Sequence, residues 1–235
     1  MSDPRPIILL TRAQAQSERL AKALQIANED AQIIVSPVLE IAFEQPDVVL
    51  PKKYAFIATS ENALLGARAL GLSLRGKIVW CVGPKTAQAA KDLGAKAIQG
   101  PGEARGLAQA IIKSNPQVPL IYLRGEHVSL DLEEILVSAG LETVSYRIYR
   151  QIPCEISPKG KAVLAGARPV ILPIYSQMSA RRLGAQIGPA TAPLHLVAIS
   201  EEVAKSWPGP KPAQQTIARN PTHEAMLRAI RSQFD

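Results

Sequence analysis

The chain of 235 residues has few aromatic side chains: three Phe, two Trp and five Tyr make up only 4% of it. A sandwich of sheets around an aromatic core is therefore not expected. Its 47% hydrophobic content is rich in Ala, Leu, Ile and Val, which is typical of helices packed on sheets. The sequence predicts an α/β protein that is long enough for one large core or two smaller ones.

Cysteine and histidine are also scarce. The two Cys residues, Cys81 and Cys154, form no C-x-x-C pair, and no group of Cys and His has the spacing of metal ligands, so no metal site is expected. No apolar run approaches the roughly 18 residues of a membrane-spanning helix, and the first six residues show no signal pattern. We expect a cytoplasmic protein that does not contact a membrane.

The formal charge of +7, from 27 Lys and Arg against 20 Asp and Glu, is spread without a run or a stripe. Such a balance favours an anionic partner. Nucleic acid is disfavoured, because binding of single strands usually needs stacking aromatic residues among the basic ones. A small anionic molecule is the more suitable ligand.

Sequence motifs of common enzymes are missing. The stretch from Gly71 to Lys77 has phosphate-loop spacing, but Ile78 replaces the Ser or Thr that should follow, and the stretch precedes a strand. No G-x-G-x-x-G follows a strand and no G-x-S-x-G occurs, so neither a dinucleotide enzyme nor a hydrolase is expected.

Short β-rich runs alternate with segments of helical spacing, which is the βα pattern of a parallel sheet. The predicted strands span 7–10, 55–58, 78–82, 120–123, 170–175 and 194–199, and the helices after them span 12–24, 61–70, 85–93, 128–139, 179–185 and 201–207.

The two halves of the chain resemble each other. Residues 59–63 (TSENA) align without gaps on 176–180 (SQMSA), whereas the partner of Thr11-Arg12 is Leu123-Arg124, near the end of the other repeat. The repeats are therefore circularly permuted.

The permuted order predicts two similar parallel-sheet βα domains, one of them discontinuous. The discontinuous domain comprises residues 1–37 and 153–235, and the inserted domain comprises 42–148. Segments 38–43 and 144–152 are predicted to be linker strands that pair as a two-stranded antiparallel ribbon. A cleft between the domains is then the expected ligand site.

Polar residues gather at the predicted strand-to-helix turns, where free backbone amides and the helix dipole favour carboxylates. The candidate binding residues are Thr11, Arg12, Thr59, Ser60, Asn62, Thr86, Arg124, Gly125, Ser176, Gln177, Ser179 and Ser200. Taken singly, each hydroxyl is also explained as a helix N-cap and each Arg as a surface residue. Tyr149, in the second linker segment, is also explained by the strand preference of Tyr.

Five segments, in this order, resemble uroporphyrinogen-III synthases, and the resemblance extends over about the whole chain. They are Leu9–Arg12, Ile57–Ala63, Val82–Ala87, Leu123–Glu126 and Val144–Arg150. The later repeat departs from the family pattern at Tyr175-Ser176-Gln177 and at Ser200, where Glu201 and Glu202 place negative charge beside an expected carboxylate site.

The resemblance implies a hydro-lyase of haem biosynthesis that cyclises hydroxymethylbilane, an open tetrapyrrole with eight carboxylates, to uroporphyrinogen III with the last ring inverted. It implies no metal and no cofactor. It also implies that Tyr149 is a general acid for the departing hydroxyl, a role that suits a phenol still protonated at neutral pH. We expect a monomer. The alternative is a non-catalytic binder of a polyanionic small molecule.

Overall fold

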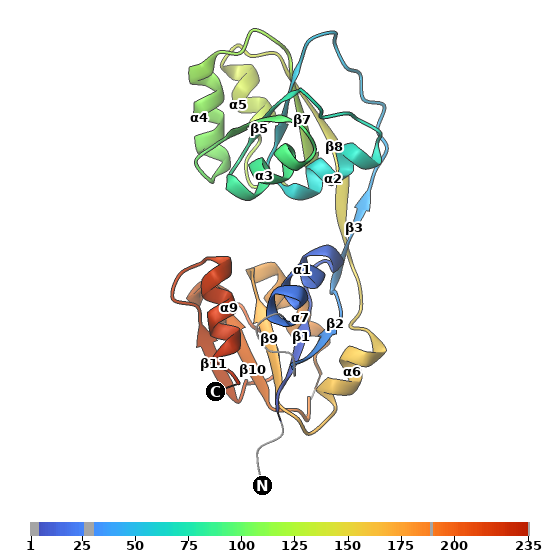
Figure 1. Ribbon diagram of the computed structural model, residues 1–235, viewed down its shortest axis with the longest axis vertical. Helices are drawn as coiled ribbons and strands as arrows, with labels where there is room; N and C mark the ends of the chain where they lie inside the picture. The colour runs from blue at the N-terminus through green and yellow to red at the C-terminus, as the bar shows by residue number, and fades with distance from the viewer. Residues whose placement is uncertain (1–4, 26–30, 189, 235) are drawn as a thin grey trace. The chain divides into compact units, whose positions relative to one another are not determined.

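The computed structural model describes residues 5–25, 31–188 and 190–234. The chain forms two compact units (Figure 1). The discontinuous unit consists of Met1–Glu40 with Ile152–Asp235, and the inserted unit consists of Ile41–Gln151. The predicted α/β fold, with two parallel sheets and one discontinuous unit, is confirmed.

The discontinuous unit has a five-stranded parallel sheet in the order β11-β10-β9-β1-β2. Its strands are β1 (Ile7–Leu10), β2 (Gln32–Val35), β9 (Val170–Ile174), β10 (Leu194–Ala198) and β11 (Gln214–Ile217), and its helices are α1 (Gln14–Gln25), α6 (Pro158–Leu164), α7 (Gln177–Gln186), α8 (Glu201–Lys205) and α9 (His223–Arg231). The apolar residues of α1 and α9 pack on one face of the sheet, and those of α6, α7 and α8 pack on the other. Burial on both faces explains the near-continuous apolar runs of its central strands.

The inserted unit has a six-stranded sheet in the order β3-β8-β7-β4-β5-β6. Its strands are β3 (Leu39–Phe43), β4 (Ala55–Ala58), β5 (Ile78–Cys81), β6 (Lys96–Gln99), β7 (Leu120–Gly125) and β8 (Thr143–Pro153), and its helices are α2 (Glu61–Ala69), α3 (Pro84–Asp92), α4 (Ala104–Ser114) and α5 (Leu132–Ser138). Helices α2 and α3 cover one face, and α4 and α5 cover the other (Figure 1).

Strands β3 and β8 form the predicted antiparallel ribbon. The amide of Glu44 donates to the carbonyl of Ile148 at 2.9 Å, and the amide of Cys154 donates to the carbonyl of Val38 at 3.1 Å. The later residue of one segment thus pairs with the earlier residue of the other, so the two strands are antiparallel. Strand β8 also pairs in parallel with β7, which the sequence did not predict. The linker strand is therefore part of the sheet of the inserted unit.

When the edge strand β3 is left out, the order β8-β7-β4-β5-β6 of the inserted unit corresponds to β2-β1-β9-β10-β11 of the discontinuous unit. The two sheets therefore share one strand order with the chain permuted, as the repeat predicted. The helix caps correct the sequence alignment by one residue, because Ser60 is the N-cap of α2 and Ser176 is the N-cap of α7. Ser60, rather than Thr59, therefore corresponds to Ser176. The cap geometry fixes this register, since each hydroxyl accepts the backbone amide three residues later.

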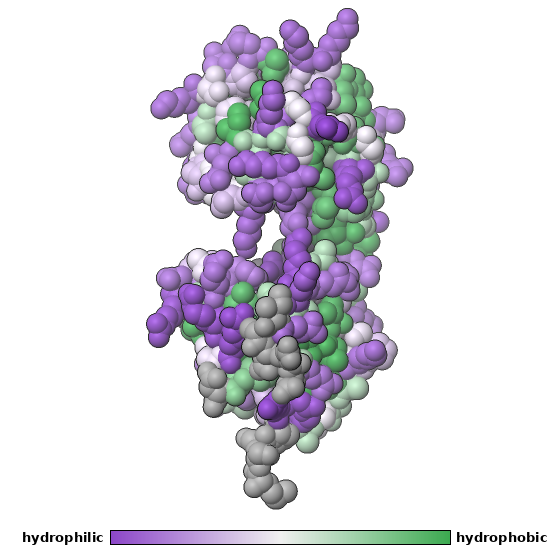
Figure 2. Space-filling model, viewed as in Figure 1, coloured by the Kyte–Doolittle hydropathy of each residue, from purple (hydrophilic) through white to green (hydrophobic). Residues whose placement is uncertain are grey.

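Several helix limits differ from the prediction. The helix predicted at 128–139 begins at Leu132, because Asp131 accepts the amide of Glu134 and caps it there. Strands β2, β6 and β11 and helices α4, α6 and α9 were not predicted. On the face seen in Figure 2, hydrophilic side chains cover most of each unit. None of the described helices has the length and apolarity needed to cross a membrane.

Candidate active site

The strand order of the inserted unit reverses between β4 and β7. From β4 the chain continues to β5 and β6 on one side, whereas β7 and β8 lie on the other side. In open α/β sheets, ligands bind at the carboxyl ends of the strands where the order reverses. Thr59 and Ser60 directly follow β4, and Gly125 ends β7, so three of the predicted residues lie at this point.

A pocket of about 400 Å³ lies at this reversal. It is lined by Thr59, Ser60, Val82, Gly102, Glu103, Ala104, Tyr122, Gly125, His127, Val128, Ser129, Leu130 and Tyr149. Among these described residues there is no Lys or Arg. The pocket therefore offers hydroxyl and phenol groups rather than positive charge.

Tyr149 enters the pocket because of a bulge in β8. Arg124 of β7 pairs with Arg147, but the next residue, Gly125, pairs with Tyr149, so Ile148 is an extra residue in β8. Consecutive residues of a regular strand face opposite sides, yet Ile148 and Tyr149 both pack in the core beneath α2 and α3. The bulge thus turns Tyr149 toward the end of β4.

Two hydroxyl–phenol pairs lie side by side at the end of β4. The Oη of Tyr149 lies 2.8 Å from the Oγ of Ser60, and the Oη of Tyr122 lies 3.3 Å from the Oγ1 of Thr59. Burial raises the pKa of the Tyr122 phenol, and the hydrogen bond with Thr59 opposes part of that rise. Tyr149 is 9% exposed, so its phenol is almost entirely enclosed by protein.

Gly125 is in direct contact with the Tyr149 ring. A Cβ at Gly125 would lie 2.6 Å from Cζ of Tyr149 and 2.9 Å from its Oη, closer than real carbon contacts allow. Only glycine at this position therefore leaves room for the ring.

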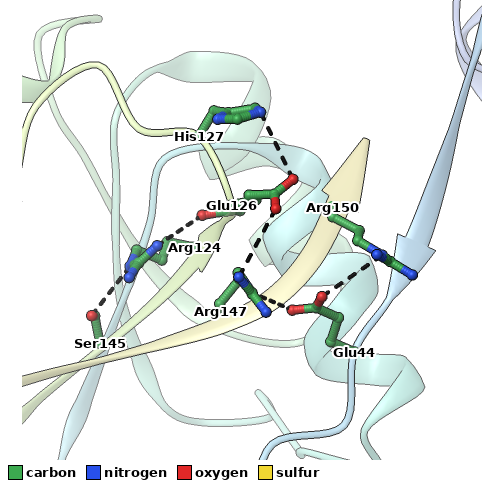
Figure 3. Close-up of polar contacts among 8 residues, drawn as sticks. Glu44, Arg124, Glu126, His127, Ser145, Arg147 and Arg150 are labelled. Carbon is green, nitrogen blue, oxygen red and sulfur yellow. Dashed lines mark hydrogen bonds and ion pairs between the residues drawn. The ribbon is translucent and has the colours of Figure 1, made fainter. Parts of the chain in front are cut away.

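The guanidinium of Arg124 bonds within its own sheet. Its Nε donates to the Oγ of Ser145 at 3.2 Å, and its Nη1 donates to the carbonyl of Gly125 at 3.1 Å (Figure 3). Nearby, Glu44 accepts from the Nε of Arg147 at 2.6 Å. Arg124 thus supports the backbone beside the pocket and does not line it.

The other predicted residues of the inserted unit lie in helices. Asn62 is half-buried in the first turn of α2, and the Thr86 side chain is buried in α3. Gly83 is the N-cap of α3 and provides no side-chain hydrogen bond, so the first amides of this helix lack a cap.

In the discontinuous unit, Thr11 and Arg12 follow β1, and Ser176 follows β9. The Thr11 side chain is buried, and the guanidinium of Arg12 lies 4.2 Å from the ring centroid of Tyr175. Burial raises the pKa of Tyr175 to about 12, and Arg12 opposes that rise. Arg12 is therefore stacked on the ring of Tyr175, which directly precedes the N-cap Ser176. The inserted unit has no such ring, because Thr59 precedes the equivalent N-cap, Ser60.

The hydroxyls that begin α7 and α8 are used locally. The Oγ of Ser176 donates to the Oγ of Ser179 at 2.8 Å, and Gln177 is exposed beside them. Ser200 caps α8, and its side-chain hydrogen bond lowers the pKa of Glu202. The carboxylate of Glu202 thus lies beside Ser200 at the start of α8, where the sequence predicts a carboxylate of the ligand.

Sequence reasoning missed four polar pocket residues: Glu103, Tyr122, His127 and Ser129. Tyr122 lies in an apolar strand run and looked like a core residue. Glu103 follows Pro101-Gly102 after a strand, a turn signal that could have located it. Within the described ranges, no group of three His, Cys, Asp or Glu side chains is placed to hold a metal ion.

The two parallel-sheet units share one permuted strand order, and a phenol-lined pocket lies where the strand order of the inserted unit reverses. These features define a two-domain α/β protein with a candidate ligand site. The structure of this chain is similar to the crystal structure of uroporphyrinogen-III synthetase from Helicobacter pylori 26695, with a TM-score of 0.65 and 15% identity over 97% of this chain and 99% of that one. A mutant uroporphyrinogen III synthase from the extremely thermophilic bacterium Thermus thermophilus matches with a TM-score of 0.48 and 19% identity, over 97% of this chain and 98% of that one.

The chain belongs to the family described as uroporphyrinogen-III synthase HemD, whose sequence profile matches residues 18–228. Its activity is that of a uroporphyrinogen-III synthase, a hydro-lyase of porphyrin and haem biosynthesis, as the sequence predicted. No curated protein sequence matches the chain.

Proposed function

We propose that hydroxymethylbilane is the substrate, and that the pocket of the inserted unit receives its hydroxymethyl-bearing pyrrole ring. The observation that carries this proposal is the position of Tyr149, whose phenol lies in the pocket 2.8 Å from the Ser60 hydroxyl. The pocket volume of about 400 Å³ fits part of a tetrapyrrole but not all of it. The lack of Lys and Arg among its described lining residues suits an uncharged ring rather than a carboxylate.

In this proposal, Tyr149 donates a proton to the hydroxyl oxygen of the substrate as the C–O bond breaks, so that water departs. Ser60 assists. Its Oγ already accepts the amide of Ala63, and its hydrogen can point to the Oη of Tyr149. The phenol hydrogen is then free for the substrate, and the phenolate that remains is stabilised by the Ser60 hydroxyl.

The carboxylates of the substrate would bind at helix starts. The start of α3 supports this part of the proposal, because Gly83 leaves its first amides without a side-chain cap and Lys85 adds positive charge there. Ser176, Gln177 and Ser200 are the corresponding candidates of the other unit.

The direct test of the activity is to incubate the protein with freshly made hydroxymethylbilane, oxidise the products, and separate the type I and type III isomers. We expect an excess of type III over a control without protein. If only type I formed, at the rate of that control, the proposed reaction would be refuted.

Replacement of Tyr149 by Phe tests the proton donor. We expect the rate of type III formation to fall by about 100-fold, at the lower end of what general acid catalysis contributes. Tyr146→Phe is a matched control, because this phenol lies on the same strand but bonds to the backbone of Val49 outside the pocket. Equal rates for the two variants would remove Tyr149 from the mechanism.

We also propose a monomer in the cytoplasm, as expected from the sequence. Sedimentation velocity would test the first expectation, and fractionation of cells would test the second.

A further inference from the structure

The pocket that holds Tyr149 also contains a carboxylate. Among the described residues that line it, Glu103 is the only Asp or Glu. Glu103 is the N-cap residue of α4, but its side chain makes no capping hydrogen bond, and no bond or ion pair to another described residue holds it. Its Oε1 lies against the first helical turn, 3.6 Å from where a Cβ on Gly106 would be. Glu103 is also exposed and lines the pocket, so its carboxylate is accessible to a bound molecule.

Helix capping does not explain this residue well. Ser, Thr, Asp and Asn are the preferred N-caps, because their short side chains reach the amide three residues on. Elsewhere in the described chain, helices such as α2 and α5 begin at a residue of this kind, and the side chains of Ser60 and Asp131 make the capping bond. Glu103 supplies charge at this position without supplying the capping bond.

Negative charge in this pocket disfavours the carboxylates of the substrate but suits a cation. When the hydroxymethyl group ionises, the C–O electron pair leaves with oxygen, Tyr149 supplies the proton that completes water, and the pyrrole nitrogen shares the positive charge left on carbon. Glu103 is an exposed residue, but a negative charge beside the pocket still attracts this cation and lowers its free energy.

We propose that the Glu103 carboxylate is the counter-charge for the cationic pyrrole ring formed as water departs. This inference rests on the proposed function, since it requires that the ring occupies the pocket of Tyr149. Glu103 lowers the barrier of this step and contributes little to binding of the uncharged ring. It therefore acts on kcat more than on KM.

The test compares Glu103→Gln with the wild-type protein in the isomer assay. We expect kcat for type III formation to fall by roughly 5-fold, because water screens the attraction between an exposed carboxylate and the cation, while KM stays level or decreases. Glu142→Gln is the matched control, since it removes the same charge at a different cavity of the same unit. It should leave both constants unchanged.

A second variant, Glu103→Ser, separates catalysis from folding. Ser is a better N-cap, so this variant should melt at the same temperature as the wild-type protein or higher, yet lose kcat as Glu103→Gln does. An unchanged kcat in both Glu103 variants, with an active wild-type protein, would overturn the role of Glu103 alone. A wild-type protein that formed no excess of type III would overturn both this inference and the proposed function.

Discussion

Replacement of Gly125 by Ala should displace the Tyr149 ring. The added Cβ would lie 2.6 Å from Cζ, 2.7 Å from Cε2 and 2.9 Å from Oη of that ring, whereas ordinary contacts are 3.4–4 Å. The ring must therefore retreat by about 1 Å, and it has little room because Tyr149 is 9% exposed. A retreat of this size lengthens its 2.8 Å bond to Ser60 beyond hydrogen-bonding distance.

Two quantities should change in the Gly125→Ala variant. Overpacking of this kind costs about 1–3 kcal/mol in the free energy of unfolding, less the gain of roughly 0.4–1 kcal/mol from replacing glycine. A catalytic group misplaced by about 1 Å costs about 100-fold in rate. Chemical denaturation would measure the first quantity, and the isomer assay would measure the second.

The double variant Gly125→Ala, Tyr149→Phe identifies the cause of the rate loss. If Gly125→Ala acts only by moving the phenol, it should cost little more rate once the phenol hydroxyl is gone. Gly188→Ala is a control for the general effect of the substitution, since a Cβ there meets nothing within 4 Å. A Gly125→Ala variant with the wild-type rate, or an equal loss with and without the Tyr149 hydroxyl, would refute the reasoning.

Three further predictions concern stability and reactivity. Ser60→Ala and Thr222→Ala each remove a helix N-cap, so each should lower the free energy of unfolding by about 1 kcal/mol. Only Ser60→Ala should also slow the reaction, because Ser60 bonds to Tyr149; the same reaction rate in both variants would contradict this. Burial raises the pKa of Tyr175 from 10.0 to about 12, so its stabilising contribution is complete below pH 10 and is lost, by at most about 3 kcal/mol, as the pH rises through 12. Between pH 9 and pH 12, the free energy of unfolding measured by denaturant titration should therefore fall less in Tyr175→Phe than in the wild-type protein. An equal fall in both proteins would contradict the raised pKa of Tyr175. Burial raises the pKa of Cys81 to about 11, so iodoacetamide at pH 8 should label it only after unfolding, and rapid labelling of the folded protein would be inconsistent with its burial.

Local patterns explain the parts of the fold that could be predicted. Apolar runs such as Ile7–Leu10 and Ala55–Ala58 are short and are followed by helical spacing, so the alternation is visible without knowledge of contacts. The edge strands β6 and β11 escaped prediction because their residues are mostly exposed and lack an apolar pattern. Cap positions also depend on geometry, which is why the alignment of Thr59 with Ser176 was one residue off.

The candidate site was predicted only in part. Thr59, Ser60, Gly125 and Tyr149 line one pocket, whereas Arg124 bonds to its own sheet. Nothing in the sequence near Arg124 indicates that Ser145 and a backbone carbonyl would occupy its guanidinium. Such contacts depend on which strands pair, and that pairing is not a local property.

By itself, the sequence determined the βα alternation, the permuted repeat and the resemblance to a family, because these depend on residue types and their order. Only the tertiary structure decided which turns meet. The strand order reverses between β4 and β7, and this brings Ser60 to the pocket that also contains Glu103. The bulge at Ile148 then turns Tyr149 into the same pocket. Both effects arise from hydrogen bonds between strands far apart in the chain, so no local pattern could specify them.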